Sequence, residues 1–311
     1  MSLPEFAIEA HGLDKTYRAA GKVPEMHALK GIDIAIPRGS IFGLLGPNGA
    51  GKSTFINILA GLVIKTSGTA RIWDIDIDEN PREARAAIGV VPQEITMDPF
   101  FTPMEALELQ AGFYGVPKAE RRSLEILAAM GLTDKKDAYV RQLSGGMKRR
   151  LMVAKALVHM PPVLILDEPT AGVDVELRRS LWNYVRELNA RGTTIILTTH
   201  YLEEAEELCD HIAIVNHGEI IASEPTPQLL KRLDQRTLVI TPKTPLSSVP
   251  DVLSGRDAIL REDGTLAITY RSTETGIGRL LDEVREAGIS VADLATEEPN
   301  LEDVFVSMTS G

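Results

Sequence analysis

A glycine-rich stretch from Gly46 to Thr54 constrains the fold more than any other feature of the chain. It follows an apolar run, Ile41 to Leu45, with the composition of a buried strand, and it opens a segment with helical periodicity from about Gly51 to Leu62. Glycines let the backbone wrap closely around an anion, and the N-terminus of the following helix adds a partial positive charge. A strand, a loop and a helix in this order predict a phosphate-binding unit within an α/β sheet.

The side chains of this loop suit the groups of a bound polyphosphate. We expect Lys52 to contact the β- and γ-phosphates, Ser53 to offer its hydroxyl to Mg²⁺, and Thr54 to bond near the α-phosphate. The complete candidate loop consists of Gly46, Pro47, Asn48, Gly49, Ala50, Gly51, Lys52, Ser53 and Thr54. The loop therefore predicts a nucleotide site with a bound magnesium ion.

A pair of acids follows a second apolar run, Val163 to Leu166. Because the carboxyl ends of parallel strands meet at one edge of a sheet, Asp167 and Glu168 are expected next to the phosphate loop. Asp167 would hold Mg²⁺ through its water shell, while Glu168 would polarise the water that attacks the γ-phosphate. We therefore interpret Glu168 as the catalytic base.

Two further polar residues follow strand-like runs. Gln93 comes after Val90 and Val91, and its side-chain carbonyl could reach the metal and the attacking water. His200 ends the run that begins at Ile195 and could contact the γ-phosphate. Each residue alone would equally suit a structural or solvated position, so their places in the larger pattern decide the interpretation.

The remaining pattern predicts two domains of α/β and α+β type. The opening stretch from Phe6 to about Ile36 is typical of short strands, and helical periodicity predicts an inserted helical subdomain at about 94–145. Apolar runs alternating with helices then predict a parallel sheet, at Val163 to Leu166, Thr194 to Thr198 and His211 to Val215. After Leu233 come a strand at 238–241, a hairpin at 258–261 and 266–270, and a helix at 274–287. We expect a first domain at 1–233 and a small α+β domain at 234–311.

The composition narrows the class of protein. The chain is 44% hydrophobic and 25% charged, and no apolar run approaches the roughly 18 residues that a membrane helix requires. Met1 to Gly12 lacks the pattern of a secretory signal, so we expect a cytoplasmic protein that does not span a membrane. The net charge of −11 argues against nucleic acid as a partner, since non-specific affinity for it comes mainly from neutralising phosphates. The single cysteine, Cys209, is interpreted as a structural thiol.

A short motif before the acid pair separates this chain from other phosphate-loop proteins. The sequence Leu143, Ser144, Gly145, Gly146 and Met147 resembles the signature motif of the ABC ATPases. This resemblance covers about residues 5 to 230 and implies an ABC-type P-loop NTPase fold with ATP as the nucleotide. It also implies the Q-loop place for Gln93, the D-loop place for Asp174, the switch-histidine place for His200, and stacking of Tyr17 on adenine.

The resemblance implies that a second copy of the chain completes each ATP site. Ser144 can cap the helix that starts at Gly145, which leaves backbone N–H groups free for an anion. Family behaviour places that anion on the other subunit, in a head-to-tail dimer with two ATP molecules at the interface. Met147 stands where the common family pattern has Gln. We interpret the following basic run, Lys148 to Arg150, as a solvated surface that faces a partner.

Three further segments resemble the ABC-2 type exporter ATPases, the group of daunorubicin-resistance-like multidrug subunits: Thr198 to Glu206, Pro92 to Glu94 and Asn300 to Phe305. This resemblance implies a peripheral subunit on the cytoplasmic face of the plasma membrane that drives a separate multi-span permease. The helical insert around Phe100 to Tyr114 would pass the closure of the dimer to that permease, and hydrolysis at Glu168 would reopen it.

Three alternatives remain open at this point. An importer ATPase shares the same cassette chemistry. A soluble ABC ATPase is disfavoured. One that acts on ribosomes is expected to carry two cassettes in one chain, and one that repairs DNA is expected to carry a long heptad arm, and this sequence has neither feature. A nucleotide-gated binding module is disfavoured by the intact Glu168 and His200.

Overall fold

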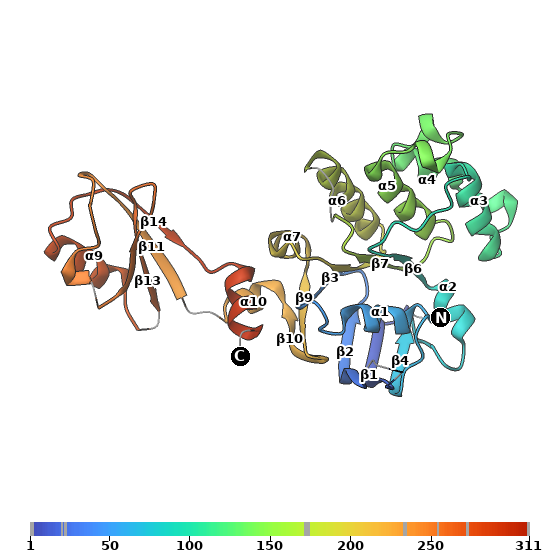
Figure 1. Cartoon of the computed structure of the whole chain (residues 1–311), viewed down its shortest axis with the longest axis horizontal. Coiled ribbons are helices and arrows are strands. Elements are labelled where there is room, and N and C mark those ends of the chain that lie inside the picture. The colour runs from blue at the N-terminus through green and yellow to red at the C-terminus, as the bar shows by residue number, and fades with distance from the viewer. Residues whose placement is uncertain are drawn as a thin grey trace. The chain divides into compact units, whose positions relative to one another are not determined.

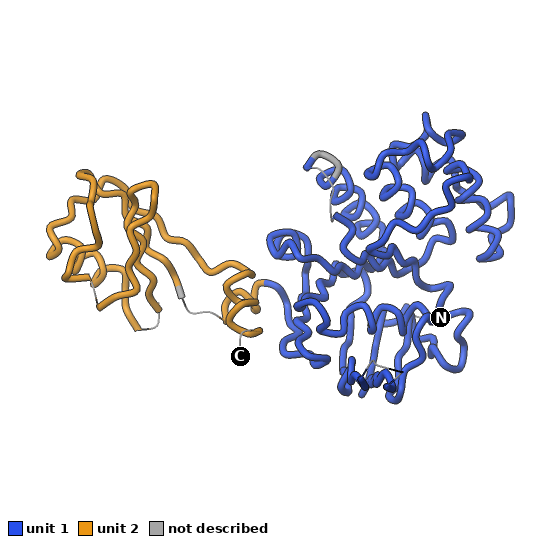
Figure 2. The backbone as a smooth tube through the Cα atoms, in the orientation of Figure 1, with its two compact units in different colours: residues 1–226 blue, residues 227–311 orange. Residues whose placement is uncertain are grey.

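The structure, a computed structural model, describes residues 3–19, 21, 24–170, 175–232, 235–253, 255–271 and 274–309. The chain divides into two compact units, residues 1–226 and residues 227–311 (Figure 2). The boundary between the units lies after Thr226, at the start of helix α8 (Thr226–Leu230). The sequence predicted the domain boundary after Leu233. The first unit contains two sheets and the second unit contains one, and each unit has its own hydrophobic core.

The first unit is built on a six-stranded sheet that carries the phosphate loop at one end. Its strand order is β10-β9-β3-β8-β7-β6, with neighbouring strands parallel except for β10, which forms an antiparallel hairpin with β9. The strands are β3 (Ile41–Leu45), β6 (Ile88–Val91), β7 (Val163–Asp167), β8 (Thr194–Thr198), β9 (His211–Asn216) and β10 (Glu219–Pro225). Strands β3 and β8 are buried along their whole length, as expected for a parallel sheet covered on both faces. The predicted α/β fold is confirmed.

A second, antiparallel sheet packs in the same unit. Its order is β2-β1-β4-β5, from β1 (Phe6–Tyr17), β2 (Met26–Pro37), β4 (Ser67–Ile72) and β5 (Ile75–Asp76). The prediction of short opening strands was wrong, because β1 and β2 are each 12 residues long. Their register shifts between Ala10 and Leu13, where Gly12 has a φ of 53°. This irregularity interrupts the alternation of apolar and polar residues from which a long strand would be predicted.

Helix α1 (Lys52–Leu59) joins the two sheets through a common core (Figure 1). Phe55 of α1 and Phe42 of β3 are among the largest fully buried side chains. The helix ends before the predicted Leu62, because Gly61 adopts a left-handed conformation with a φ of 71°, which is typical of a helix C-terminus. The packing of α1 thus fixes the end of the loop from which it starts.

The other helices of the first unit include those of the predicted helical insert. Helix α3 begins at a Thr102 capping box, in which the Thr102 side chain accepts from the Glu105 N–H and the Glu105 carboxylate accepts from the Thr102 N–H. The helices are α2 (Pro81–Ala86), α3 (Pro103–Phe113), α4 (Ser123–Ala129), α5 (Gly145–Ala156), α6 (Val175–Ala190) and α7 (Leu202–Leu208). Short 3₁₀ turns at Lys118–Glu120, Thr133–Lys135 and Val140–Gln142 connect α3, α4 and α5. Within the described ranges, no helix has the length and apolar character needed to cross a bilayer.

The second unit is a small α+β domain. Its antiparallel sheet has the order β12-β13-β11-β14, from β11 (Gln235–Pro242), β12 (Asp257–Leu260), β13 (Leu266–Arg271) and β14 (Val291–Glu297). Leu280 and Val284 of helix α9 (Ile277–Glu286) pack in one core with Leu238 and Ile268 of the sheet. A 3₁₀ turn (Asp251–Leu253) and a last helix, α10 (Leu301–Thr309), complete the unit. Helix α9 begins later than the predicted Glu274, because Gly276 is its extended N-cap residue.

We expect Leu280→Ala to lower the free energy of unfolding of the second unit by about 2–5 kcal/mol, because this side chain is fully buried in that unit's core. Hydrogen exchange should become faster in β11 and β13 while the amides of β3 keep their protection. The matched control is Leu281→Ala, which truncates a partly buried neighbour and should cost less. Equal acceleration in β3 and β13 would contradict the assignment of a separate core.

Candidate functional site

The phosphate loop packs its backbone tightly against two neighbouring strands. Gly46 has a φ of 155°, and a Cβ atom at this position would lie 2.2 Å from the carbonyl oxygen of Val215 in β9. At Gly51, with a φ of 113°, a Cβ would lie 2.7 Å from the carbonyl oxygen of Ala28 in β2. Any side chain at these two positions would displace backbone, so glycine is required at both for steric reasons.

A cavity of about 590 Å³ lies over the loop. Its lining brings together the loop, the first residue of β2, and residues that follow three strands of the six-stranded sheet: Met26, Asn48, Gly49, Ala50, Gly51, Lys52, Ser53, Thr54, Gln93, Glu168 and His200. The carboxyl ends of β6, β7 and β8 therefore meet the loop at one edge of the sheet. A cavity of this size and polarity suits a phosphorylated ligand.

Lys52 lies almost completely buried at the start of α1. Its ammonium group donates to the carbonyl oxygens of Gly46 at 2.6 Å and Pro47 at 3.1 Å. Burial lowers the pKa of Lys52, and the nearby carboxylates of Glu168 and Asp167 oppose this shift. A bound polyphosphate would act in the same direction as the carboxylates and favour the charged lysine.

Glu168 is held between two of the other predicted residues. The Gln93 amide nitrogen donates to Glu168 Oε2 at 2.6 Å, and His200 Nε2 pairs with Glu168 Oε1 at 2.5 Å. The backbone of Glu168 has a φ of 49°, a left-handed conformation that is uncommon for a residue with a side chain. Its N–H donates to both the carbonyl and the hydroxyl oxygen of Thr198, each at 3.1 Å. This strained residue is thus fixed at its backbone and at its carboxylate.

Asp167 is oriented by the same threonine. The Thr198 hydroxyl donates to Asp167 Oδ1 at 2.5 Å while it accepts from the Glu168 N–H. Thr198 is completely buried in β8 and therefore links both acids to the neighbouring strand. Sequence reasoning did not single out Thr198, although its place one residue before the end of the run from Ile195 to Thr199 was a usable signal.

The basic run after the signature motif differs from its prediction as a solvated surface. Arg149 is 4% exposed, and its guanidinium donates to the carbonyl oxygens of Pro92 and Gln93, both at 2.8 Å. Arg150 donates to the Met130 carbonyl oxygen at 2.7 Å. Helical spacing explains the burial, since Arg149 shares one face of α5 with the buried Met152 and Val153. Burial lowers the pKa of Arg149, while Asp167 and Glu168 act in the opposite direction.

The signature residues lie apart from the cavity of their own chain. Ser144 is the N-cap of α5, and its hydroxyl accepts from the N–H of Met147 at 3.2 Å. Leu143 is buried, Ser144 and Gly145 are exposed, and Gly146 and Met147 are partly exposed. None of these five described residues lines the 590 Å³ cavity. The exposed N-terminus of α5 remains available to a ligand outside this chain.

Among the residues predicted to bind nucleotide or metal, Gly46, Pro47, Asp167 and Tyr17 are absent from the lining of the cavity. Tyr17 does not line the cavity, but its hydroxyl lies 3.5 Å from the Thr54 hydroxyl, and its register partner Met26 does line the cavity. Met26 escaped sequence reasoning because it follows the insert of the opening stretch. Asp174 lies outside the described residues.

The donor set at this edge fits a hard divalent ion. Asp167, Ser53 and Gln93 offer carboxylate, hydroxyl and amide oxygens, and Mg²⁺ favours such oxygens together with those of a bound phosphate. Over the described part of the chain, no cluster of three or more His, Cys, Asp or Glu side chains could hold a metal by itself. The residues therefore suit a metal that shares its ligands with a nucleotide rather than a free-standing metal centre.

Comparisons with known proteins agree with this geometry. A family model described as ABC transporter matches residues 29–171. The linearmycin resistance ATP-binding protein LnrL of Bacillus subtilis (strain 168) is 37% identical, over 97% of this chain and 98% of its own. DrrA of Streptomyces peucetius, a daunorubicin/doxorubicin resistance ATP-binding protein, is 35% identical over 98% of this chain and 93% of its own. The Nod factor export ATP-binding protein I of Ralstonia nicotianae (strain ATCC BAA-1114 / GMI1000) is 35% identical over 99% and 94%.

Solved structures resemble the larger part of the chain. An ATP-binding subunit of an ABC transporter has 29% sequence identity and a TM-score of 0.66, over 73% of this chain and 92% of that chain. A dimeric ATP-binding cassette in a post-hydrolysis state, bound to ADP and Pi, has 29% identity and a TM-score of 0.64, over 70% and 98%.

We expect Arg149→Leu to lower the free energy of unfolding by about 2–4 kcal/mol, because it leaves the Pro92 and Gln93 carbonyl oxygens buried without their donor. Arg149→Lys should recover only part of this loss, since one ammonium cannot match the geometry of a guanidinium that bonds two carbonyls. Urea unfolding measures both values, with Lys148→Gln as the control on the same helix. Equal stability of Arg149→Leu and wild type would contradict the assigned contacts.

Proposed function

The chain belongs to the ABC transporter family as an ATP-binding and ATP-hydrolysing subunit, and we propose that it powers an exporter of the ABC-2 type whose membrane-spanning part is a separate polypeptide. The observation that carries the hydrolytic part is the placement of Glu168 between Gln93 and His200 over the phosphate loop. Export is supported by relatives named for drug resistance and Nod factor export that match nearly the whole chain. None of these relatives favours the alternative of an importer.

ATP would occupy the 590 Å³ cavity, with its phosphates on the loop. Lys52 would exchange the carbonyl oxygens of Gly46 and Pro47 for β- and γ-phosphate oxygens, and Thr54 would bond near the α-phosphate. Tyr17, the last residue of β1, pairs with Met26, the first residue of β2, and these two side chains would contact the adenine. Mg²⁺ would be held by Ser53, Gln93 and Asp167, and when bound it would neutralise charge on the phosphates.

Glu168 would accept a proton from the water that attacks the γ-phosphate. Its carboxylate has two hydrogen-bonding partners that hold its orientation, Gln93 and His200. His200 also lines the cavity, so its imidazole would contact the γ-phosphate while it stays beside Glu168. Fixed donors around the developing charge would lower the barrier, since they need no rearrangement during the reaction.

A second copy of the chain would complete each site. The exposed Ser144 caps the N-terminus of α5, where N–H groups favour an anion, and yet it does not line the cavity of its own chain. A head-to-tail dimer would bring Ser144 and the neighbouring glycines against the ATP of the partner. One solved relative is itself a dimeric cassette bound to ADP and Pi.

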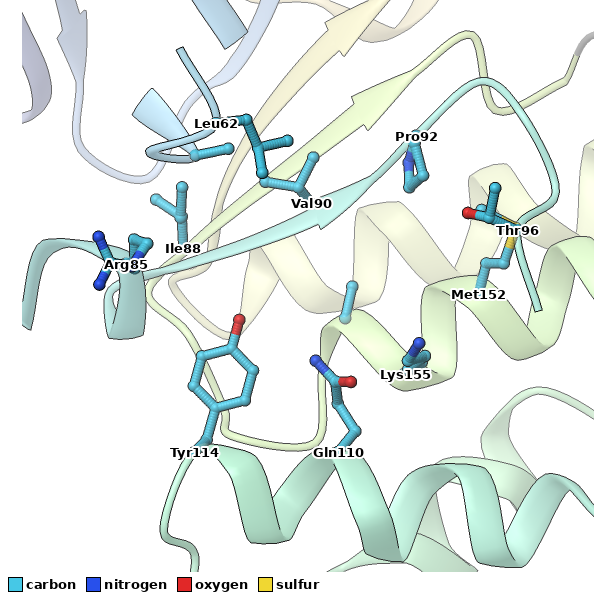
Figure 3. A pocket seen from close by; sticks show the side chains of 12 residues that line it. Leu62, Arg85, Ile88, Val90, Pro92, Thr96, Gln110, Tyr114, Met152 and Lys155 are labelled. Carbon is cyan, nitrogen blue, oxygen red and sulfur yellow. The ribbon is translucent and has the colours of Figure 1, made fainter. Parts of the chain in front are cut away.

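A second cavity supports the presence of a membrane partner (Figure 3). Gln110 of α3 and Tyr114, the C-cap residue that follows α3, point toward Ile88 and Val90 of β6, across a space of about 210 Å³. The lining comprises Ala60, Leu62, Arg85, Ile88, Val90, Pro92, Thr96, Gln110, Tyr114, Met152, Lys155 and Ala156. Leu62, which lines this cavity, is exposed, and so are Ile64, two residues further on, and Phe113, which precedes Tyr114. Exposed apolar side chains beside a hollow are typical of an interaction surface, so the permease would seat a cytoplasmic segment here, on the cytoplasmic face of the membrane.

Glu168→Gln is expected to lower steady-state ATP hydrolysis by at least about 100-fold, because the amide cannot accept the proton of the attacking water. ATP binding should persist, and the dimer should accumulate with ATP. Phosphate release measures the first effect, and size-exclusion chromatography with light scattering measures the second, with ADP as the control nucleotide. Unchanged hydrolysis would refute the role of Glu168.

Affinity purification of tagged Glu168→Gln protein from detergent-solubilised membranes with ATP tests the proposal that the chain powers a transporter. Only co-purification of a stoichiometric multi-span membrane protein would support that proposal.

Phe113→Ser should abolish co-purification of that membrane protein, because Phe113 is 73% exposed and belongs to the surface proposed for docking. ATP hydrolysis by the isolated subunit should stay within about twofold of wild type, since an exposed substitution rarely alters the fold. The matched control is Leu124→Ser, which removes a 55% exposed apolar side chain from α4. Loss of the membrane protein with both variants would contradict a docking surface at α3.

A further inference from the structure

Glu204 is a buried carboxylate for which the proposed mechanism has no use. It lies in the first turn of α7 and is 7% exposed. Burying a carboxylate is costly unless partners satisfy it. Glu204 has three such partners from three separate segments: Thr170 Oγ1 donates at 3.0 Å, Thr199 Oγ1 donates at 3.1 Å, and Arg178 Nε lies at 3.2 Å.

Two of these partners adjoin the residues proposed to act on ATP. Thr199 immediately precedes His200, and Thr170 follows Glu168 after a single residue. Both threonines are buried, and both donate to the same atom, Glu204 Oε2. One carboxylate oxygen therefore ties the segment after β7 to the segment after β8.

His200 is at the centre of a small turn that this carboxylate anchors. The Thr199 hydroxyl accepts from the N–H of Tyr201 at 3.0 Å while it donates to Glu204. The N–H of Glu204 in turn donates to the Tyr201 carbonyl oxygen at 3.0 Å. The His200 side chain is 44% exposed, so packing alone does not hold it in place. Its position depends on this backbone turn and on the contact with Glu168.

Arg178 of α6 supports the other side of the turn. Its guanidinium lies 4.5 Å from the centre of the Tyr201 ring, and its Nε faces Glu204 Oε1 as an ion pair without hydrogen-bond geometry. The Glu204 carboxylate therefore contacts Thr199 directly and the Tyr201 ring through Arg178, so it is linked to both neighbours of His200.

We propose that Glu204 is a positioning residue that holds His200 against Glu168 by fixing the turn from Thr199 to Tyr201. This inference rests on the proposed roles of Glu168 and His200 in ATP hydrolysis. A glutamine of the same size cannot replace Glu204, because its amide has a single acceptor oxygen. Either its NH₂ group would face the two threonine hydroxyls, which need an acceptor, or it would face the Arg178 cation.

Glu204→Gln should lower kcat for ATP hydrolysis by roughly tenfold while KM for ATP stays within about twofold, because the phosphate loop is untouched. Glu203→Gln, on the exposed neighbouring position of α7, is the matched control and should retain wild-type kcat. Thr199→Val should reproduce the loss by removing the hydroxyl, and Thr199→Ser should restore it. These two variants also serve as the test if Glu204→Gln fails to fold.

A double-mutant cycle separates positioning from a general loss of stability. In a His200→Ala background, Glu204→Gln should change kcat by less than about twofold, since the residue it positions is absent. A full tenfold loss in that background would overturn the proposal. A direct readout is the imidazole resonance of His200, followed by NMR in the nucleotide-free protein: it should shift in Glu204→Gln and not in Glu203→Gln.

An unshifted His200 resonance in Glu204→Gln would overturn the positioning role whatever the rates are. If the resonance shifts but His200→Ala hydrolyses ATP at the wild-type rate, the proposed catalytic role of His200 fails while its positioning by Glu204 stands.

Discussion

The close approach of the loop at Gly46 to the backbone of β9 is the constraint on which the rest of the site depends. With only 2.2 Å between a hypothetical Cβ and the Val215 carbonyl oxygen, the chain can pass from β3 into α1 only if this residue is glycine. The passage places Lys52 at the first turn of α1, buried where its ammonium group meets the loop carbonyls. Because α1 then packs Phe55 into the core shared by both sheets, the position of the phosphate site is set by the same apolar packing that stabilises the unit.

Buried threonine hydroxyl groups orient three acids of the first unit, of which Glu168 lines the cavity. Thr198 bonds both Asp167 and Glu168, and Thr170 and Thr199 bond Glu204. A threonine suits this role because its β-branched side chain has few rotamers, so its hydroxyl is held in one direction. Arg149 adds a buried cation that interacts favourably with the charges of Asp167 and Glu168. The site thus combines buried charge with hydrogen bonds from several segments to each acid, and such bonds rigidify a buried polar network.

Residues whose position follows from local pattern could be predicted from the sequence, and residues defined by remote contacts could not. The loop, Gln93, Glu168 and His200 share one cavity because each follows a strand of a parallel sheet. Arg149 donates to two backbone carbonyls far away in the chain. Because every residue has a backbone carbonyl, the sequence does not indicate which ones accept from a side chain. The length of β1 was missed for a related reason, since the bulge at Gly12 breaks the alternation that signals a strand.

Helix α5 connects three features that the sequence presents separately. Its N-terminus carries Ser144, its middle carries Arg149 against the backbone of Gln93, and its last turns carry Met152 and Lys155 into the cavity proposed for the permease. An α-helix rises about 1.5 Å per residue, so Ser144 and Lys155 stand roughly 16 Å apart on one rigid element. If the permease segment displaced Lys155, α5 would move as one element, and the movement would be passed directly to the signature residues and to the backbone of Gln93. Since Gln93 also bonds Glu168, the same helix would link the membrane partner to the proposed catalytic base and, in the proposed dimer, to the ATP of the second subunit.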